Sequence, residues 1–245
     1  MYRAASLAAL LLAWHLGSAI AGERLLPSPE TVLLALVGEA RSGALALNLS
    51  VTLARVAAAF TLAIWAGAAI GYAMGRSSGF DRFADPWLIL LLNLPALVII
   101  MLAYIWLGLT EAAAIGAVAI NKLPNTIAMV REGARALDPD LDEMGRAFAF
   151  DRWTRMRHVV VPQLAPYLAA AARTGLSLTW KIVLVVELIG RPNGVGFAIG
   201  TAFQLFDVAS ILAYALCFVA VMMVIETWVV QPLERRASSW RSKPD

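Results

Sequence analysis

The sequence predicts an all-α integral membrane protein, and two observations support this fold class. Of the 245 residues, 60% are hydrophobic and only 15% are charged, whereas an average soluble domain has about 25% charged residues. The apolar residues occur in six runs, each close to the roughly 20 residues that a helix needs to cross a bilayer. The composition excludes a disordered chain, and the single cysteine, Cys217, excludes a disulfide scaffold.

The expected spans follow one another within a single transmembrane domain that covers residues 1–245. They lie at 4–22, 49–75, 86–108, 112–130, 164–189 and 207–230. The third of these runs is the cleanest. A long charged stretch at 131–163 separates the fourth span from the fifth. We find no internal repeat and no soluble domain.

The first apolar run allows two interpretations. Arg3, the apolar stretch and Ala19-Ile20-Ala21 have the order of a secretory signal peptide with its cleavage site. Cleavage would leave five spans and an external N-terminus. We expect the run to be retained as a membrane anchor.

The basic residues set the expected orientation, because cytoplasmic loops of membrane proteins are rich in lysine and arginine. With the N-terminus in the cytoplasm, thirteen basic residues fall on the inner side and three, Arg24, Arg41 and Arg191, on the outer side. We therefore expect both termini to be cytoplasmic. The net charge of +3 reflects these loops, and we expect no nucleic-acid partner.

Residues 131–163 have the pattern of two short amphipathic helices. Asp138 is placed to cap the first, with Pro139 at its first position, and Asp151 is placed to cap the second. The segment could lie on the inner leaflet with its apolar face toward lipid, or it could project from the bilayer and bind a partner. The apolar positions concerned are Leu141, Met144 and Phe148 in the first helix and Trp153, Met156 and Val160 in the second.

Several short motifs lie in and beside this segment. Glu143-Met144-Gly145 is followed by Ala149, and Pro162 comes 13 residues after Ala149. This pattern resembles the cytoplasmic-loop motif of bacterial ABC-importer permeases, in which Glu-Ala-Ala precedes a glycine and then Ile-x-Leu-Pro. The likeness is closest to the sulfonate, taurine and nitrate branch. It covers nearly the whole chain, through Leu26-Pro27-Ser28-Pro29, Asn125-Thr126, Glu187, Gly194-Val195-Gly196 and the stretch from Val159 to Pro162.

The motif departs from the family pattern at several positions. Met144 and Gly145 stand where the family has two alanines, Ala149 stands at its glycine and Val161 at its leucine. If that glycine has a positive φ between two short helices, alanine costs roughly 1–2 kcal/mol there. Either Gly145 takes the bend one turn earlier, or the first helix continues through Ala149.

The resemblance implies the fold of a type I ABC-importer permease, with six transmembrane helices and a cytoplasmic coupling helix that fits a groove on a separate ATPase. It also implies that ATP and Mg²⁺ bind to that ATPase, with no cofactor in this chain. The sequence contains no G-x-x-x-x-G-K-[ST] and no H-E-x-x-H motif, so we expect no catalytic residue and no metal site. The residues implied for coupling are Asp142, Glu143, Arg146, Ala147, Ala149 and Phe150.

Ionisable residues inside the spans indicate the substrate path, because a charge at the centre of a membrane helix costs about 2.5–3.5 kcal/mol and usually faces a cavity or a partner. Lys122 and Lys181 lie near the middles of two spans, where either could attract an anion. The alternative is an interhelical partner such as Glu111 or Glu226. Arg55 is expected to extend toward the interface. The expected path residues are Lys122, Lys181, Glu187 and Asn93.

Two further segments lie on the expected outer side. Residues 25–45 are expected to lie along the surface, and Gly194–Phe206, apolar but short, to form a re-entrant or interfacial segment at the outer gate. In the resembling family, such faces receive a substrate-loaded binding protein.

The residues and the resemblance together predict the permease subunit of an ATP-driven importer in a bacterial inner membrane. The expected cargo is a small anion such as a sulfonate, taurine, nitrate or an aromatic carboxylate. The expected partners are a second permease copy, two ATPase subunits, an extracytoplasmic binding protein and the lipid bilayer. Two alternatives are a secondary transporter without an ATPase, which usually shows internal repeats, and a membrane anchor, which needs no charges within its spans.

Overall fold

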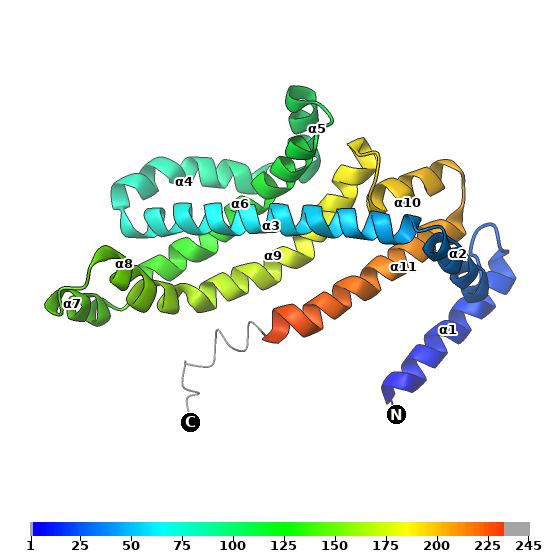
Figure 1. Cartoon of the computed structure of the whole chain (residues 1–245), viewed down its shortest axis with the longest axis horizontal. Coiled ribbons are helices and arrows are strands. Elements are labelled where there is room, and N and C mark those ends of the chain that lie inside the picture. Colours follow the sequence, from blue (N-terminus) through cyan, green and yellow to red (C-terminus); the bar gives the residue numbers. More distant parts are fainter. Residues whose placement is uncertain (1, 233–245) are drawn as a thin grey trace. The chain divides into compact units, whose positions relative to one another are not determined.

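In the computed structural model, which describes residues 2–232, every regular element is helical. This confirms the predicted all-α class for these residues. Figure 1 shows the elements in chain order. They are α1 (Tyr2–Ala21), α2 (Pro29–Arg41), α3 (Ala44–Arg76), α4 (Ser78–Asn93), α5 (Ala96–Leu107), α6 (Glu111–Arg135), α7 (Pro139–Ala147), α8 (Arg152–Arg155), the π-helix η1 (Met156–Val160), α9 (Val161–Gly190), α10 (Val195–Gln204), α11 (Val208–Ile225) and the π-helix η2 (Glu226–Val230).

Four helical runs among the described residues are long and apolar enough to cross a membrane. They are α3, α6, the continuous run Arg152–Gly190 and the run Val208–Trp228. A fifth crossing is added when the bent pair α4–α5 is counted as one span, and α1 supplies a shorter apolar stretch, Ala8–Ala21. The described helices therefore provide four or five crossings by this measure, and the predicted number of six is not confirmed.

The third predicted span differs from expectation. The sequence predicts one helix over 86–108, but the chain bends by 100° between α4 and α5. Leu94 is extended with ψ 127°, and Pro95 follows it as the N-cap of α5. Proline has no N–H to continue a helix, and its ring disfavours the helical conformation of the residue before it. Pro95 therefore separates two helices where we expected a single span.

The chain forms two compact units. Among the described residues, unit 1 comprises those from Tyr2 to Ala54 together with Leu184–Val224, and unit 2 comprises Arg55–Val183 together with those that follow Val224. Both units combine segments that are distant in sequence, and α3 and α9 contribute to both. The basic residues Arg235, Arg236, Arg241 and Lys243, which enter the predicted orientation, lie outside the described residues.

In unit 2, α3 packs closely against α6 through three glycines spaced four residues apart, Gly67, Gly71 and Gly75. A Cβ atom at Gly71 would lie only 2.6 Å from the carbonyl oxygen of Ile127, and one at Gly67 would lie 2.6 Å from Cβ of Thr126. Small residues at this spacing allow membrane helices to approach each other closely. The four-residue spacing of these glycines is visible in the sequence, but the close packing that it allows was not predicted.

Candidate functional site

The candidate site for coupling is the segment Asp138–Val161, called the coupling segment below. Asp138 caps α7 by accepting a hydrogen bond from the backbone N–H of Asp140 at 2.9 Å, and Pro139 occupies the first helical position. Asp151 caps α8 through Thr154 and Trp153. These hydrogen bonds, chiefly from Thr154, lower the pKa of Asp151. Both predicted caps are confirmed, and that of Asp151 weakens as the pH falls through its folded-state pKa.

The turn between α7 and α8 is formed at Ala149, which has a positive φ of 51°. The N–H of Phe150 donates to the carbonyl of Gly145 at 2.9 Å, and the N–H of Ala149 donates to that of Arg146 at 3.0 Å. This is the Schellman arrangement, in which the left-handed position is normally glycine. The helix therefore neither bends at Gly145 nor continues through Ala149, and both alternatives raised by the sequence are wrong.

Replacing Ala149 with glycine is expected to stabilise this turn by about 1 kcal/mol, because glycine adopts a positive φ without the Cβ penalty. Amide hydrogen exchange of Ala149 and Phe150 should slow accordingly. The matched control is Ala147→Gly within α7, which should destabilise the helix by a similar amount. Faster exchange in A149G than in the wild type would contradict the expectation.

Asp142 lies at the centre of an arginine cluster within the protein. Its carboxylate pairs with Arg76 at the end of α3 at 3.6 Å, with Arg146 one turn along α7 at 3.3 Å, and with Arg155 in α8. Asp142 and Arg155 also line a cavity of about 180 Å³ at this junction. Asp142 therefore holds α7 against α3 and α8 and does not project outward.

The outward surface of the coupling segment combines charged and apolar side chains. Glu143, Arg146, Ala147 and Ala149 are exposed, whereas Phe150 is half-buried and packs near Gly145. Large apolar side chains are exposed as well, led by Phe148 at 72% and Trp153 at 70%, and including Leu141 and Met144. Figure 1 shows α7 and α8 together at one end of unit 2. An exposed apolar face on so short a helix is typical of a binding surface.

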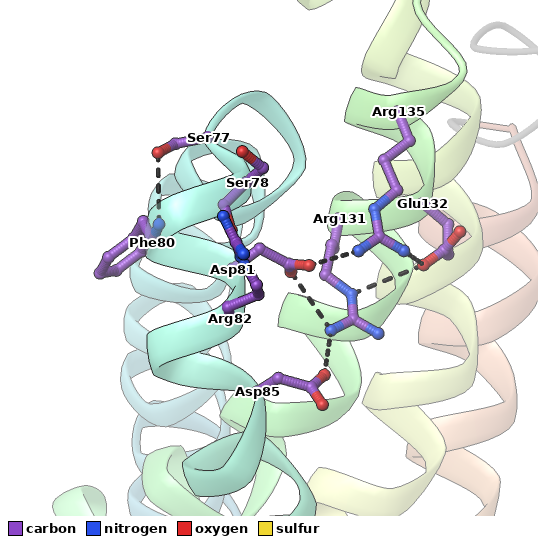
Figure 2. A network of polar contacts seen from close by, with 9 residues as sticks. All are labelled: Ser77, Ser78, Phe80, Asp81, Arg82, Asp85, Arg131, Glu132 and Arg135. Atoms are coloured by element: carbon purple, nitrogen blue, oxygen red, sulfur yellow. Dashed lines mark hydrogen bonds and ion pairs between the residues drawn. The ribbon is translucent and has the colours of Figure 1, made fainter.

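A second charged network, which sequence reasoning missed, ties α4 to α6 (Figure 2). Arg131 donates to Asp85 at 2.5 Å, and Arg135 donates to Asp81 at 2.6 Å and to Glu132 at 3.0 Å. These two arginines were expected only to add positive charge to a cytoplasmic loop. The sequence did contain a signal for this network. Asp81 and Asp85 are four residues apart and so share a helix face, and the same holds for Arg131 and Arg135.

Lys122 is enclosed by protein. Its side chain is 2% exposed, and its Nζ donates to the carbonyl of Ala171 in α9 at 3.2 Å. Gly175, one turn further along α9, leaves the space that the lysine side chain fills. The structure therefore places Lys122 in the packing between α6 and α9.

Lys181 and Asn93 are exposed. The ammonium group of Lys181 lies 5.5 Å from the ring centre of Trp180, within the range of a cation–π interaction. The amide of Asn93 donates back to the carbonyl of Ile89 at 2.7 Å, at the end of α4 next to the 100° bend. These are the two predicted path residues whose side chains are not enclosed.

Arg55 does not extend alone toward the interface as expected. It forms a two-pronged pair with Glu111, at 2.9 Å from Nε and 2.7 Å from Nη2, and is only 4% exposed. Glu111, which the sequence suggested as a partner for a lysine, therefore binds Arg55 instead. This ion pair joins α3 to α6. Such bidentate geometry is the strong form of an ion pair.

Glu187 is fully buried in unit 1. The hydroxyl of Thr52 donates to its carboxylate, 2.9 Å from both oxygens, and the backbone N–H of Gly196 donates to it at 2.9 Å. The carboxylate therefore lies at the N-terminus of α10 and contacts α3. The four predicted path residues divide into two exposed side chains and two that are enclosed by protein.

Comparison with known proteins gives one family. The model of the binding-protein-dependent transport system inner membrane component matches residues 59–238. A Bacillus subtilis protein named as an aliphatic sulfonates transport permease, SsuC, is 27% identical over 96% of this chain and 86% of its own length. The taurine transport system permease protein TauC of Escherichia coli is 24% identical over 89% of this chain and 81% of its length. The nitrate import permease protein NrtB of Synechococcus elongatus is 24% identical over 79% of this chain and 73% of its own length.

Solved structures share the fold. The inward-facing MetNI methionine ABC transporter superposes with a TM-score of 0.67 at 17% identity, covering 81% of this chain and 98% of that chain. An amino acid ABC transporter gives a TM-score of 0.64 at 21% identity, covering 82% of this chain and 97% of that chain. The helices therefore follow the arrangement of ABC-importer permeases.

Proposed function

Because the chain belongs to the family of binding-protein-dependent transport system inner membrane components, we propose that it forms the membrane path of an ATP-driven importer for a small anion. It is an inner-membrane ABC permease of the sulfonate, taurine and nitrate branch. The observation that carries the proposal is the coupling segment, whose capped helix α7 is anchored by Asp142 and presents Glu143 and Phe148 outward.

The coupling segment is proposed to bind an ATPase subunit on the cytoplasmic side. Its exposed residues would contact the ATPase, and Asp142 would transmit the displacement of α7 to Arg76 and Arg155. ATP and Mg²⁺ would bind to the ATPase alone. The residues proposed for direct contact are Glu143, Arg146, Ala147 and Ala149, with Phe150 supporting them.

The proposed assembly contains two copies of this chain, two ATPase subunits and an extracytoplasmic binding protein. Both termini would lie in the cytoplasm, with the first apolar run retained. Membership in the family supports a partner ATPase and a binding protein, and the excess of basic residues on one side of the spans supports the orientation.

Lys181 and Asn93 are the residues that we propose to face the path, because both are exposed. The ammonium group of Lys181, near the middle of a predicted membrane span, favours an anionic cargo. The names of relatives that transport sulfonates, nitrate and bicarbonate agree with that charge, and taurine carries the same sulfonate group. Lys122 and Glu187, enclosed by protein, would support the helices that line the path.

The experiment that tests the proposal is reconstitution of the chain in proteoliposomes with candidate ATPase and binding-protein subunits from the same genome. ATP hydrolysis would be measured with taurine, an alkanesulfonate, nitrate and bicarbonate, and with a cationic amine as the control. Stimulation by one anion and its uptake at the expense of ATP would support the proposal. Anion uptake by the chain alone, driven by an ion gradient, would contradict it and favour a secondary transporter.

Lys181→Ala is expected to lower anion uptake by about tenfold, the effect of losing roughly 1.4 kcal/mol of attraction. Lys181→Arg, which keeps the charge, should retain most of the uptake. Both variants should bind the ATPase as the wild type does, which pull-down in detergent would measure. Unchanged uptake in K181A would remove Lys181 from the path.

A further inference from the structure

The start of α10 is held by side chains from other helices. Three consecutive backbone N–H groups donate outward, to an amide oxygen at 2.9 Å, a hydroxyl at 2.8 Å and a carboxylate at 2.9 Å. An α-helix leaves its first N–H groups without intrahelical acceptors, and here α3 supplies two acceptors and α9 one. We call this cluster the α10 joint; its donor–acceptor pairs are Gly194 to Asn48, Val195 to Thr52 and Gly196 to Glu187.

The glycines of the joint allow this close approach. Gly194 has φ +110°, and a Cβ atom there would overlap the carboxylate of Glu187. A Cβ at Gly196 would lie 2.8 Å from Cβ of Glu187. The loop therefore fits against Glu187 only because both positions lack a side chain.

The buried carboxylate needs these donors. Glu187 is 0% exposed and Thr52 is 0% exposed, and a buried charge without hydrogen bonds is strongly unfavourable. The hydroxyl of Thr52 donates to Glu187 and accepts from Val195, so it links the carboxylate to the backbone. The N-terminal end of a helix dipole also favours a negative charge.

The joint extends to two more helices of unit 1. The amide of Asn48 donates to the hydroxyl of Tyr214 in α11 at 3.2 Å, and that hydroxyl donates to Glu39 in α2 at 2.6 Å. The amide oxygen of Asn48 therefore accepts a hydrogen bond from the backbone N–H of Gly194, while its amide nitrogen donates to Tyr214.

We infer that Glu187 and Thr52 are positioning residues for transport, which fix α10 to α9 and α3 so that α10 keeps its place on them through the transport cycle. α9 continues without interruption from the coupling segment, so α10 is attached to the helix that a bound ATPase would displace. The role in transport rests on the proposed function, whereas the fixation of α10 does not.

The test uses Thr52→Val, which removes the hydroxyl at nearly constant volume, with Thr52→Ser as the control that retains it. Hydrogen exchange of the Val195 and Gly196 amides is measured on the full chain in lipid nanodiscs. We expect T52V and Glu187→Ala to exchange about tenfold faster than the wild type and T52S to exchange at the wild-type rate. Asp81→Asn, in unit 2, should leave these amides unchanged.

The second readout is the number of substrate molecules transported per ATP hydrolysed in the reconstituted complex. We expect T52V to lower this ratio about tenfold, with ATP hydrolysis largely preserved. T52S, which retains the hydroxyl, should keep the wild-type ratio. Wild-type exchange in T52V would overturn the fixation of α10, and this measurement needs no ATPase. Transport lost in E187A with exchange unchanged would also overturn the inference, because Glu187 would then act on the substrate directly.

Discussion

Replacing Asp142 with alanine is expected to lower ATP-driven transport about tenfold or more, while the chain still inserts into the membrane. Asp142 pairs with Arg76, Arg146 and Arg155, so its removal leaves three guanidinium groups facing one another at the base of α7. These groups are partly exposed, and solvent screening limits the loss of local stability to about 1–2 kcal/mol. That loss is enough to loosen a nine-residue helix, but not to unfold the membrane spans.

The measurement is uptake and ATP hydrolysis in proteoliposomes, with and without loaded binding protein. Asp140→Ala is the matched control, because Asp140 is exposed on the same helix and takes part in none of these ion pairs. Uptake by the Asp142→Asn variant should fall between that of D142A and that of D140A, since asparagine keeps hydrogen-bonding atoms but loses the charge. Wild-type stimulation of ATP hydrolysis in D142A would show that the anchoring of α7 is not needed for coupling.

Gly175→Ala is expected to destabilise the protein by about 1–3 kcal/mol, because the added Cβ would overlap Cε and Nζ of Lys122 and displace the lysine side chain. Lys122 is 2% exposed, and shifting its ammonium group would break its hydrogen bond to the carbonyl of Ala171. Thermal unfolding in detergent, followed by tryptophan fluorescence, measures the effect. The yield of folded protein from membranes should fall in parallel.

A second substitution shows whether the overlap is the cause. Lys122→Ala combined with Gly175→Ala should recover most of the lost stability, because the methyl group then occupies space that the lysine vacates. Gly116→Ala is the control on α6, since a Cβ there meets nothing within 4 Å and should stabilise the helix slightly. A double variant no more stable than G175A would indicate that Lys122 and Gly175 do not share this space.

The coupling segment was the best predicted part of the chain, because its structure follows local rules. The caps at Asp138 and Asp151 depend on residues two or three positions away, and both are present. The cost of alanine at a left-handed position was foreseen for Ala149, but the sequence did not reveal that the backbone takes this conformation there. The inward role of Asp142 was missed because two of its three arginine partners come from other helices.

The third span and the path residues were predicted less well. Hydropathy shows that 86–108 is apolar, but it does not report the 100° bend at Pro95. Lys122, Arg55 and Glu187 each contact a polar partner that the sequence did not identify. The partner of Arg55 is 56 positions away, and Thr52 is 135 positions from Glu187. No periodicity within one helix identifies such pairs.

The sequence by itself determined the all-α membrane class, the family and the two capped helices of the coupling segment. These properties follow from composition, from the length of apolar runs and from hydrogen bonds between near neighbours. Only the tertiary structure decided which helix faces meet, and so which charges are enclosed. Helix periodicity places Lys122 and Gly175 on particular faces, but only the packing of α6 against α9 brings those faces together.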